Sequence, residues 1–394
     1  MVSRAATNQT HGEQALLGSA AAAALIMAVG MGFGRFAYTG VYPVMVSEGV
    51  LTVHDGTLAA SANYAGYLLG ALLAARLASH QAYRWVLGST AASIFCLFAL
   101  AFTPVPWMVI AIRGMAGVFS ALSMIAASLW LLQHKSYQRG APMLFAGVGV
   151  GIFASAELLA LAEYLGLKSA GLWLALGAGS AALGGLALLR LDSSPVELND
   201  SSNAPMHRGH VPLGAWSLIA AYGLAGFGYI ITATYLPMLV KNGLGDINPV
   251  HVWAVFGLGA APSCYLWHSV HHRFGTHLAL RVNLLVQALG VVLPVAVPNA
   301  AGYLGSALVV GGTFMGTVTI AMPAAKRVSH TIKFNLLAIM TAAYGIGQII
   351  GPLLANALFS RTQSFDASLL AAGAGLSLSA LLTLRLPITR QSSR

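Results

Sequence analysis

The sequence predicts an all-α membrane protein with twelve transmembrane helices in two six-helix halves, and three observations lead to this prediction. Of the 394 residues, 57% are hydrophobic and 8% are charged, and the mean hydropathy is +0.76. Ordinary soluble domains carry about 25% charged residues, so a water-soluble globule is excluded. The apolar runs do not alternate in polarity, which excludes a transmembrane β-barrel. Twelve spans with short connections use about 33 residues each and account for the chain length.

Apolar runs, divided by proline, glycine and charged residues, place the spans along the chain. The first run is far longer than the core of a signal peptide, so it is expected to be a retained helix. The predicted spans are 15–46, 53–79, 85–102, 106–133, 141–163, 169–190, 213–240, 250–270, 277–297, 301–325, 334–359 and 366–386. The predicted units are an N-terminal tail at 1–14, a first half at 15–191, a cytoplasmic linker at 192–212, a second half at 213–386 and a C-terminal tail at 387–394.

The distribution of positive charge predicts the orientation, because loops rich in lysine and arginine stay in the cytoplasm. Fifteen of the twenty such residues fall on the side of the predicted spans that holds both termini. Three fall on the other side, Lys168, Lys241 and Arg361, and two lie inside spans, Arg35 and Arg113. We therefore expect both termini in the cytoplasm and a multi-pass protein of the inner, cytoplasmic membrane. Because the basic residues form small groups between apolar runs, no nucleic-acid partner is expected.

The two halves carry matching motifs in their first helices. Gly32–Gly34 with Pro43 recurs as Gly226–Gly228 with Pro237, 194 residues later. A glycine pair of the fifth predicted span recurs in the eleventh at a similar offset of 196. With six spans in each half, these offsets indicate a parallel duplication about an axis along the membrane normal.

Three segments resemble a particular group of transporters. Gly32–Thr39 (GFGRFAYT) with Pro43, and Gly347–Leu354 (GQIIGPLL), resemble the YbfB/YjiJ-like branch of the major facilitator superfamily. Arg113 with Gly117 resembles the arginine motif of the fourth span in proton-coupled members of that superfamily. The resemblance implies two six-helix halves that rock around a site near the bilayer midplane, with the first and fourth spans lining the central cavity.

Three ionisable side chains, Arg35, Arg113 and Glu157, stand well inside predicted spans and at similar depth. Such groups are expensive in lipid and are retained mostly where they face a cavity or a partner. We expect Glu157 to neutralise Arg113 or Arg35 when the site is empty and to accept the coupling proton. The alternative is a purely structural ion pair that fixes helix packing.

One helix face of the first span combines Arg35, Tyr38 and Tyr42 at i, i+3 and i+7, which suits a carboxylate with an aromatic or apolar body. In the alternative interpretation, Tyr42 is an interfacial residue and Tyr38 an ordinary helix contact. The other expected substrate-binding residues are Asn63, Tyr67, Arg113, Tyr229, Thr232, Tyr344 and Gln348. Tyr222 lies on the same helix face as Tyr229 and Thr232, and Thr341 on the same face as Tyr344 and Gln348.

Neither a cofactor nor a metal site is expected. Cys96 and Cys264 lie in apolar segments, so neither a disulfide nor a cysteine-based metal site is implied. No nucleotide-binding motif occurs in the sequence. A histidine cluster has metal-ligand spacing in part, but at a cytoplasmic loop solvated side chains are the commoner explanation: His268, His271, His272 and His277.

The sequence predicts a proton-coupled secondary active transporter that moves a small amphipathic organic solute, an organic anion, by alternating access. Its expected partners are that solute, protons and membrane lipid, and we expect a monomer. The alternative within transport is a proton-driven efflux pump for drugs or hydrophobic metabolites, in which the two buried arginines would be structural. An intramembrane enzyme would need a nucleophile, metal or acid–base cluster in the spans, and a sensor would normally add a soluble signalling domain, so neither is expected.

Overall fold

A computed structural model describes residues 2–103, 105–192, 214–240, 248–329 and 336–384, with side chains left undescribed at 2–12, 326 and 329. Within these ranges every regular element is a helix. A first group comprises α1 (Val2–Met27), the π-helix η1 (Ala28–Phe36), α2 (Tyr38–Ser47), α3 (Val53–Ala74), η2 (Ser79–Gln81), α4 (Ala82–Leu100), α5 (Pro106–Leu129), the π-helix η3 (Trp130–His134), η4 (Gln138–Gly140), α6 (Ala141–Tyr164) and α7 (Ser169–Leu188). A second group comprises α8 (Ala215–Val240), α9 (Val250–Ala296), α10 (Ala300–Ser329), α11 (Leu336–Thr362) and α12 (Asp366–Leu381).

Nine helices of the described ranges are long and apolar enough to cross a membrane. This count takes α1, η1 and α2 together as one span at Glu13–Ser47, and it takes the 47-residue α9 as another. Inside α9, Gly275 has φ 77° and ψ 172°, a non-helical conformation that favours glycine, and the predicted spans 250–270 and 277–297 lie on either side of it. The helices α3 and α12 are outside the nine. The chain is thus an all-helical membrane protein, and the number of crossings stays a prediction.

Local sequence explains several helix starts. At the start of α3, Thr52 and Asp55 form a capping box, in which each side chain accepts a hydrogen bond from the other residue's backbone N–H. Pro106 begins α5, where the missing N–H has no helical acceptor to lose. These signals position the ends of α3 and α5, two helices that pack along each other in the first group.

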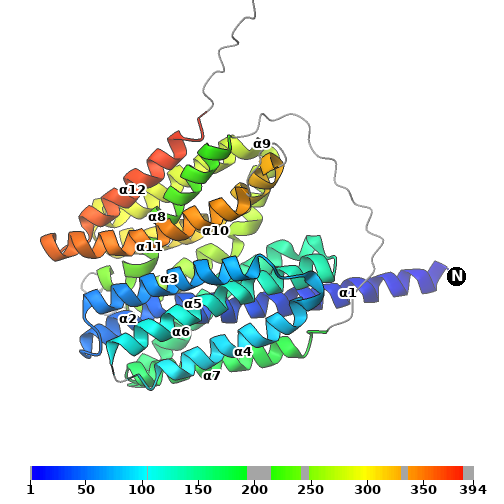
Figure 1. Ribbon diagram of the computed structural model, residues 1–394, viewed down its shortest axis with the longest axis horizontal. Coiled ribbons are helices and arrows are strands. Elements are labelled where there is room, and N and C mark those ends of the chain that lie inside the picture. Colours follow the sequence, from blue (N-terminus) through cyan, green and yellow to red (C-terminus); the bar gives the residue numbers. More distant parts are fainter. Residues whose placement is uncertain (1, 104, 193–213, 241–247, 330–335, 385–394) are drawn as a thin grey trace, which may run out of the picture.

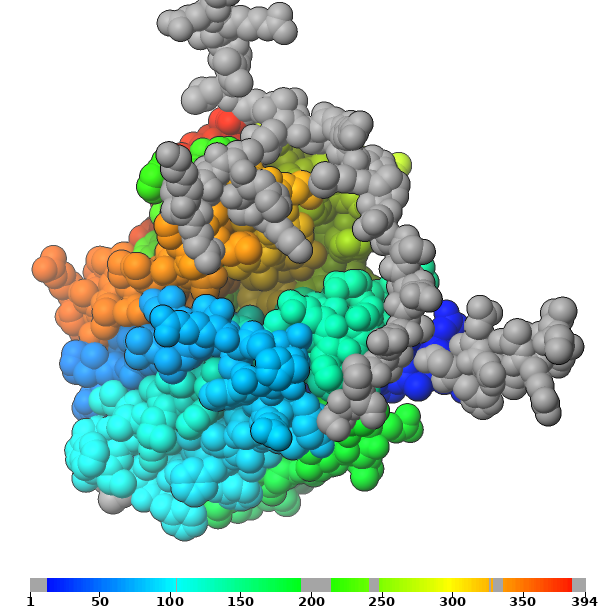
Figure 2. Space-filling model, turned by 45° about the vertical axis from the view of Figure 1, so that its right-hand side comes forward, coloured from blue at the N-terminus to red at the C-terminus, as the bar shows by residue number. Residues whose placement is uncertain are grey.

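The two groups of helices lie side by side with their axes running broadly along the same direction (Figure 1). They meet where α3 packs on α11, α6 on α9 and α2 on α8. In the space-filling view the blue surface of α3 adjoins the orange surface of α11 (Figure 2). The candidate site lies between the two groups.

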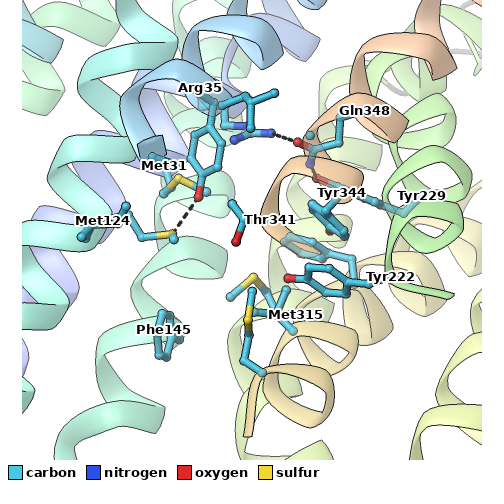
Figure 3. A pocket seen from close by; sticks show the side chains of 18 of the residues that line it. Met31, Arg35, Met124, Phe145, Tyr222, Tyr229, Met315, Thr341, Tyr344 and Gln348 are labelled. Carbon is cyan, nitrogen blue, oxygen red and sulfur yellow. Dashed lines mark hydrogen bonds between the residues drawn. The ribbon is translucent and has the colours of Figure 1, made fainter. Parts of the chain in front are cut away.

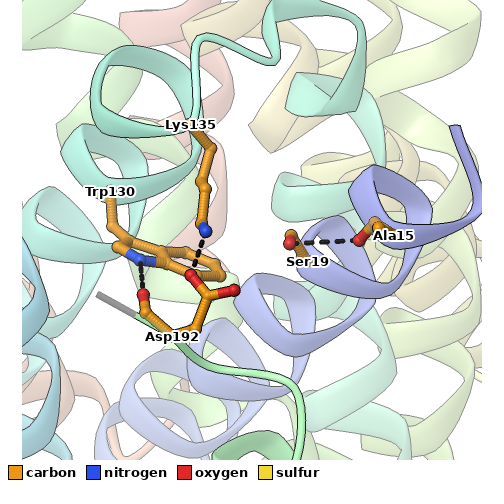
Figure 4. A network of polar contacts seen from close by, with 5 residues as sticks. All are labelled: Ala15, Ser19, Trp130, Lys135 and Asp192. Carbon is orange, nitrogen blue, oxygen red and sulfur yellow. Dashed lines mark hydrogen bonds and ion pairs between the residues drawn. The ribbon is translucent and has the colours of Figure 1, made fainter. Parts of the chain in front are cut away.

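We name the two ends of the bundle the Lys135 end and the Glu48 end, after a residue at each. At the Lys135 end, the Lys135 ammonium pairs with the carboxylate of Asp192, whose carbonyl accepts a hydrogen bond of 2.9 Å from the Trp130 indole (Figure 4). These contacts tie the end of α7 to η3. At the Glu48 end, the Glu48 carboxylate accepts hydrogen bonds from the backbone N–H and the hydroxyl of Ser169 at the start of α7. Side-chain contacts therefore join α7 and the segment after it to neighbouring parts of the first group at both ends.

Candidate functional site

The π-helical segment η1 brings the glycine-rich motif of the first span into the interior. Its turn is wider than that of an α-helix, since the Ala37 N–H donates to the carbonyl of Gly32, five residues earlier, at 2.9 Å. Gly32 faces Gly151 of α6 so closely that a Cβ at Gly32 would overlap the Gly151 backbone. Every residue of η1 is buried, including Arg35.

Arg113 of α5 holds this segment in place. Its guanidinium donates to the carbonyl of Gly34 at 3.0 Å and to the carbonyl of Arg35 at 2.9 Å. The guanidinium carbon lies 4.5 Å from the ring centroid of Tyr38. Asn63 of α3 donates to the Arg113 carbonyl at 2.9 Å. Arg113 and Asn63 were predicted to bind substrate, but neither lines the cavity. Arg113 donates to backbone carbonyls of η1, and Asn63 donates to the backbone carbonyl of Arg113.

Arg35, in contrast, turns toward the second group of helices. Its Nη2 donates to Oε1 of Gln348 at 2.9 Å, and the Gln348 amide nitrogen donates to the Tyr229 hydroxyl (Figure 3). The Tyr67 ring centroid lies 3.9 Å from the guanidinium carbon and covers one face of that group. Arg35 is only 3% exposed, and its Nε finds no acceptor among the described residues. A cation with an unused donor therefore lies between the two groups of helices.

A cavity of about 250 Å³ extends from Arg35 toward the Lys135 end. Its walls are mainly aromatic and methionine side chains, and among the described residues that line it Arg35 alone carries a charge. The lining comprises Met31, Arg35, Phe36, Tyr67, Leu68, Ala71, Met124, Ile125, Phe145, Tyr222, Tyr229, Phe314, Met315, Val318, Met322, Thr341, Tyr344, Gly345 and Gln348. Such a mostly apolar pocket with a few polar groups is typical of a small-molecule site.

Half of the predicted substrate-binding residues line this cavity. They are Arg35, Tyr67, Tyr229, Tyr344 and Gln348, and Tyr222 and Thr341 join them. The methionine and phenylalanine walls were not predicted, because an apolar residue in an apolar helix carries no signal of the cavity it faces.

The predicted face of Tyr38 and Tyr42 is directed elsewhere. The Tyr38 hydroxyl donates to the Gly56 carbonyl at 3.0 Å, and the Tyr42 hydroxyl donates to the Val53 carbonyl at 2.9 Å. Both side chains are buried against the start of α3, so neither is an interfacial residue and neither lines the cavity. Thr232 is also buried away from it, with no partner for its hydroxyl among the described residues.

A set of neutral hydrogen bonds closes the cavity toward the Glu48 end by joining the two groups of helices. Thr39 donates to the Ala233 carbonyl at 2.8 Å, the hydroxyls of Thr57 and Tyr235 are 2.8 Å apart, and those of Tyr64 and Thr234 are 2.9 Å apart. We name Thr39, Thr57, Tyr64, Thr234 and Tyr235 the hydroxyl seal. All five are buried, so the passage between the groups is shut on this side of Arg35.

The expected pairing of Glu157 with an arginine is wrong. Its carboxylate lies 2.9 Å from Nδ1 of His251 at the start of α9, and both side chains are about two-fifths exposed. Glu157 follows Gly149 and Phe153 at intervals of four, and these two residues pack on α9 at Ala261 and Gly257. The helical period thus turns Glu157 toward α9 and away from η1.

In the structure, histidines of the cluster lie within hydrogen-bonding distance of neighbouring groups, and the two cysteines are buried. The His271 ring lies 3.0 Å from the hydroxyl of Thr276, and the His277 ring lies 3.1 Å from the carbonyl of Thr383. Cys96 and Cys264 are buried free thiols. In the described ranges no three histidine, cysteine, aspartate or glutamate side chains come together as a group that could hold a metal ion.

Comparison with known proteins identifies the family. No curated protein matches the chain. The family model described as "Uncharacterised MFS-type transporter YbfB" matches residues 27–384 and so spans η1, the cavity and the hydroxyl seal. That family points to membrane transport rather than enzymatic catalysis. The chain therefore belongs to the YbfB-type family of transporters of the major facilitator superfamily.

Proposed function

We propose that this protein is a proton-coupled secondary active transporter that carries a small amphipathic organic anion by alternating access. The observation that carries the proposal is the buried guanidinium of Arg35, which has an unused N–H and faces an otherwise uncharged, mainly apolar cavity. A cation at this depth is costly unless an anion neutralises it. A solute with one negative charge and an apolar body would satisfy both parts of the site.

The proposed architecture has twelve crossings in two halves of six, with α9 supplying two crossings around Gly275. We place the Lys135 end in the cytoplasm of the inner membrane, because the excess of lysine and arginine lies on that side of the predicted spans. The cavity then faces the cytoplasm and the hydroxyl seal closes the outer side. Rocking of the two halves would open the seal and shut the Lys135 end. We propose that a monomer performs this cycle.

We propose that Glu157 carries the coupling proton at the Glu48 end. Its support is the 2.9 Å contact with His251, because this contact joins α6 of the first group to α9 of the second. Separation of the groups at this end would open both side chains, already about two-fifths exposed, further to the outer solution. Protonation of Glu157 there would remove the carboxylate charge from this contact and weaken the closed arrangement.

An efflux pump for drugs or hydrophobic metabolites is the second candidate. Four methionines in the cavity wall favour it, because flexible, polarizable methionine side chains adapt to ligands of different shape. In that case the substrate would need no charge, and Arg35 would serve only to join the two groups through Gln348.

A ligand-stabilisation experiment on purified full-length protein separates the two candidates, since ligands that bind the native state raise its unfolding temperature. Benzoate and octanoate should raise that temperature in the wild type, and tetraphenylphosphonium should not. Arg35→Ala should abolish the anion effect and Arg35→Lys should strongly reduce it, because an ammonium lacks the planar fork of donors.

The exposed Arg84 at the start of α4 offers a matched control, and Arg84→Ala should keep the wild-type response. Stabilisation by tetraphenylphosphonium in both the wild type and Arg35→Ala, without any effect of the anions, would instead favour the efflux pump.

A further inference from the structure

The hydrogen bond between Arg35 and Gln348 leaves part of the hydrogen-bonding capacity of the Arg35 guanidinium unused. Tyr67 covers one of its faces at 3.9 Å, so ligands reach it along the edge that carries the N–H donors. On that edge the Gln348 amide supplies one neutral oxygen to Nη2, and Nε has no acceptor among the described residues. A carboxylate carries two oxygens in one plane and accepts two parallel N–H bonds from an arginine, each stronger than a bond to a neutral amide.

We propose that the amide oxygen of Gln348 stands where a carboxylate oxygen of the substrate binds, and that the substrate is a monocarboxylate that displaces Gln348 from Arg35. This inference rests on the proposed function and narrows its substrate to one class of organic anion. Gln348 is then a specificity-determining residue, because any solute must outcompete its amide for the guanidinium. Neutral amides and esters with the same apolar body offer no stronger acceptor than Gln348 and are rejected.

The limit to a single negative charge follows from the other arginine. Arg113 already donates to two backbone carbonyls at 3.0 and 2.9 Å and lies outside the cavity wall. Among the described lining residues, a second negative charge would therefore meet no cation. A dicarboxylate would bury one charge without a partner, which is strongly unfavourable at this depth.

When the substrate displaces Gln348, the hydrogen bond between Arg35 and Gln348, which joins the two groups of helices, is replaced by a bond from Arg35 to the substrate. Arg35 belongs to the first group, and Gln348 and Tyr229 belong to α11 and α8 of the second (Figure 3). The Gln348 amide nitrogen already donates to the Tyr229 hydroxyl, so its side chain keeps a partner after it leaves Arg35. The bound carboxylate then takes over the acceptor position on Arg35, with its apolar body against the methionine and aromatic wall.

The test uses Gln348→Glu and Gln348→Met in purified full-length protein, with benzoate, phenylacetate and octanoate as probes of the unfolding temperature. Gln348→Glu supplies a permanent carboxylate to Arg35, so it should unfold at a higher temperature than wild type and lose the response to all three probes. Gln348→Met keeps the side-chain length and removes the competing acceptor. It should bind the responsive probes about fivefold more tightly, the factor that one neutral hydrogen bond is worth.

Ser128→Ala is the matched control, because the Ser128 hydroxyl bonds its own helix at the Met124 carbonyl and Ser128 does not line the cavity. It should keep the wild-type affinity. Weaker probe binding by Gln348→Met, or an unchanged response in Gln348→Glu, would overturn the displacement. No response of the wild type to any of the three monocarboxylates, or an equal response to succinate, would overturn the substrate class. If the organic-anion function itself is wrong, the result is different: tetraphenylphosphonium then stabilises both the wild type and Arg35→Ala.

Discussion

At the scale of single residues, the two buried arginines differ in what their donors meet. Both guanidinium groups have an Nε–H with no acceptor among the described residues, but Arg113 donates through its two Nη atoms to the carbonyls of Gly34 and Arg35 and so stabilises the π-helical segment, whereas Arg35 meets a single neutral amide and faces the cavity. Two carbonyls of the fold depend on Arg113, and the remaining donors of Arg35 are left for a ligand. Removal of Arg113 should therefore lower stability, whereas removal of Arg35 should not.

We expect Arg113→Gln to lower the free energy of unfolding by about 1–3 kcal/mol for each carbonyl that loses its donor. Arg35→Gln should leave stability unchanged or raise it, because it removes an incompletely paired buried charge. Denaturant unfolding of both variants in the same detergent measures the difference. Equal losses in the two variants would contradict the distinction drawn between the arginines.

The sequence identifies Arg35, Tyr67 and Gln348 because polar groups within apolar spans are rare and need a reason. It does not separate Arg35 from Arg113, since the two lie at similar depth and only the position of the neighbouring carbonyls decides which guanidinium bonds the backbone. The sequence likewise does not show that Tyr38 lies outside the cavity wall. Its hydroxyl bonds a carbonyl of α3, and the sequence does not show how close that helix lies.

At the scale of elements, the packing of α6 on α9 decides the environment of Glu157. Gly149 and Phe153 approach the backbone of α9 at Ala261 and Gly257, and Glu157 continues that stripe to His251. The helix starts and breaks follow from capping residues and glycines and are largely predictable. The π-helix at Ala28–Phe36 is not, because its contacts are with the Arg113 side chain of α5 and with the Gly151 backbone of α6, both distant in sequence.

Glu157→Gln should remove proton-driven accumulation of substrate while leaving downhill equilibration intact, because the neutral amide keeps the size of the side chain but cannot titrate. Transport into proteoliposomes with and without an imposed pH gradient measures the difference. Glu163→Gln is the control, since Glu163 lies on the same helix and accepts a hydrogen bond from Asn248 at the same end. Accumulation by Glu157→Gln as strong as in the wild type would remove Glu157 from the coupling mechanism.

At the scale of the whole molecule, the cavity and the hydroxyl seal lie at successive depths between two groups of helices. The cavity wall extends toward the Lys135 end, where α8 and α11 begin, and the seal lies nearer the Glu48 end. Arg35 and Tyr229 stand 194 residues apart, the same offset as the two glycine motifs, and both contact Gln348. The end at which the groups are closed is a property of one conformation and leaves no mark in the sequence.

The proposed orientation predicts that a reporter fused after Arg394, and another inserted near Ser201, both lie in the cytoplasm, because lysine and arginine are concentrated on that side. A reporter near Asn248 should lie on the outer side. Fusions to alkaline phosphatase and to green fluorescent protein, which are active on opposite sides of the membrane, measure these positions. Labelling of an introduced cysteine near Asn299 exclusively from inside the cell would contradict the orientation.

The hydroxyl seal has an electrical consequence. Membrane voltage does work on charge alone, about 2.3 kcal/mol for each elementary charge carried through 100 mV. The five side chains of the seal are neutral, so their separation moves no charge and its rate should not respond to voltage or to ionic strength. In the proposed cycle, the electrical force acts instead on Arg35, whose charge a bound carboxylate cancels, and on Glu157, whose charge the coupling proton cancels. A more negative cell interior then changes turnover through the steps that move these two charges, without altering the opening of the seal.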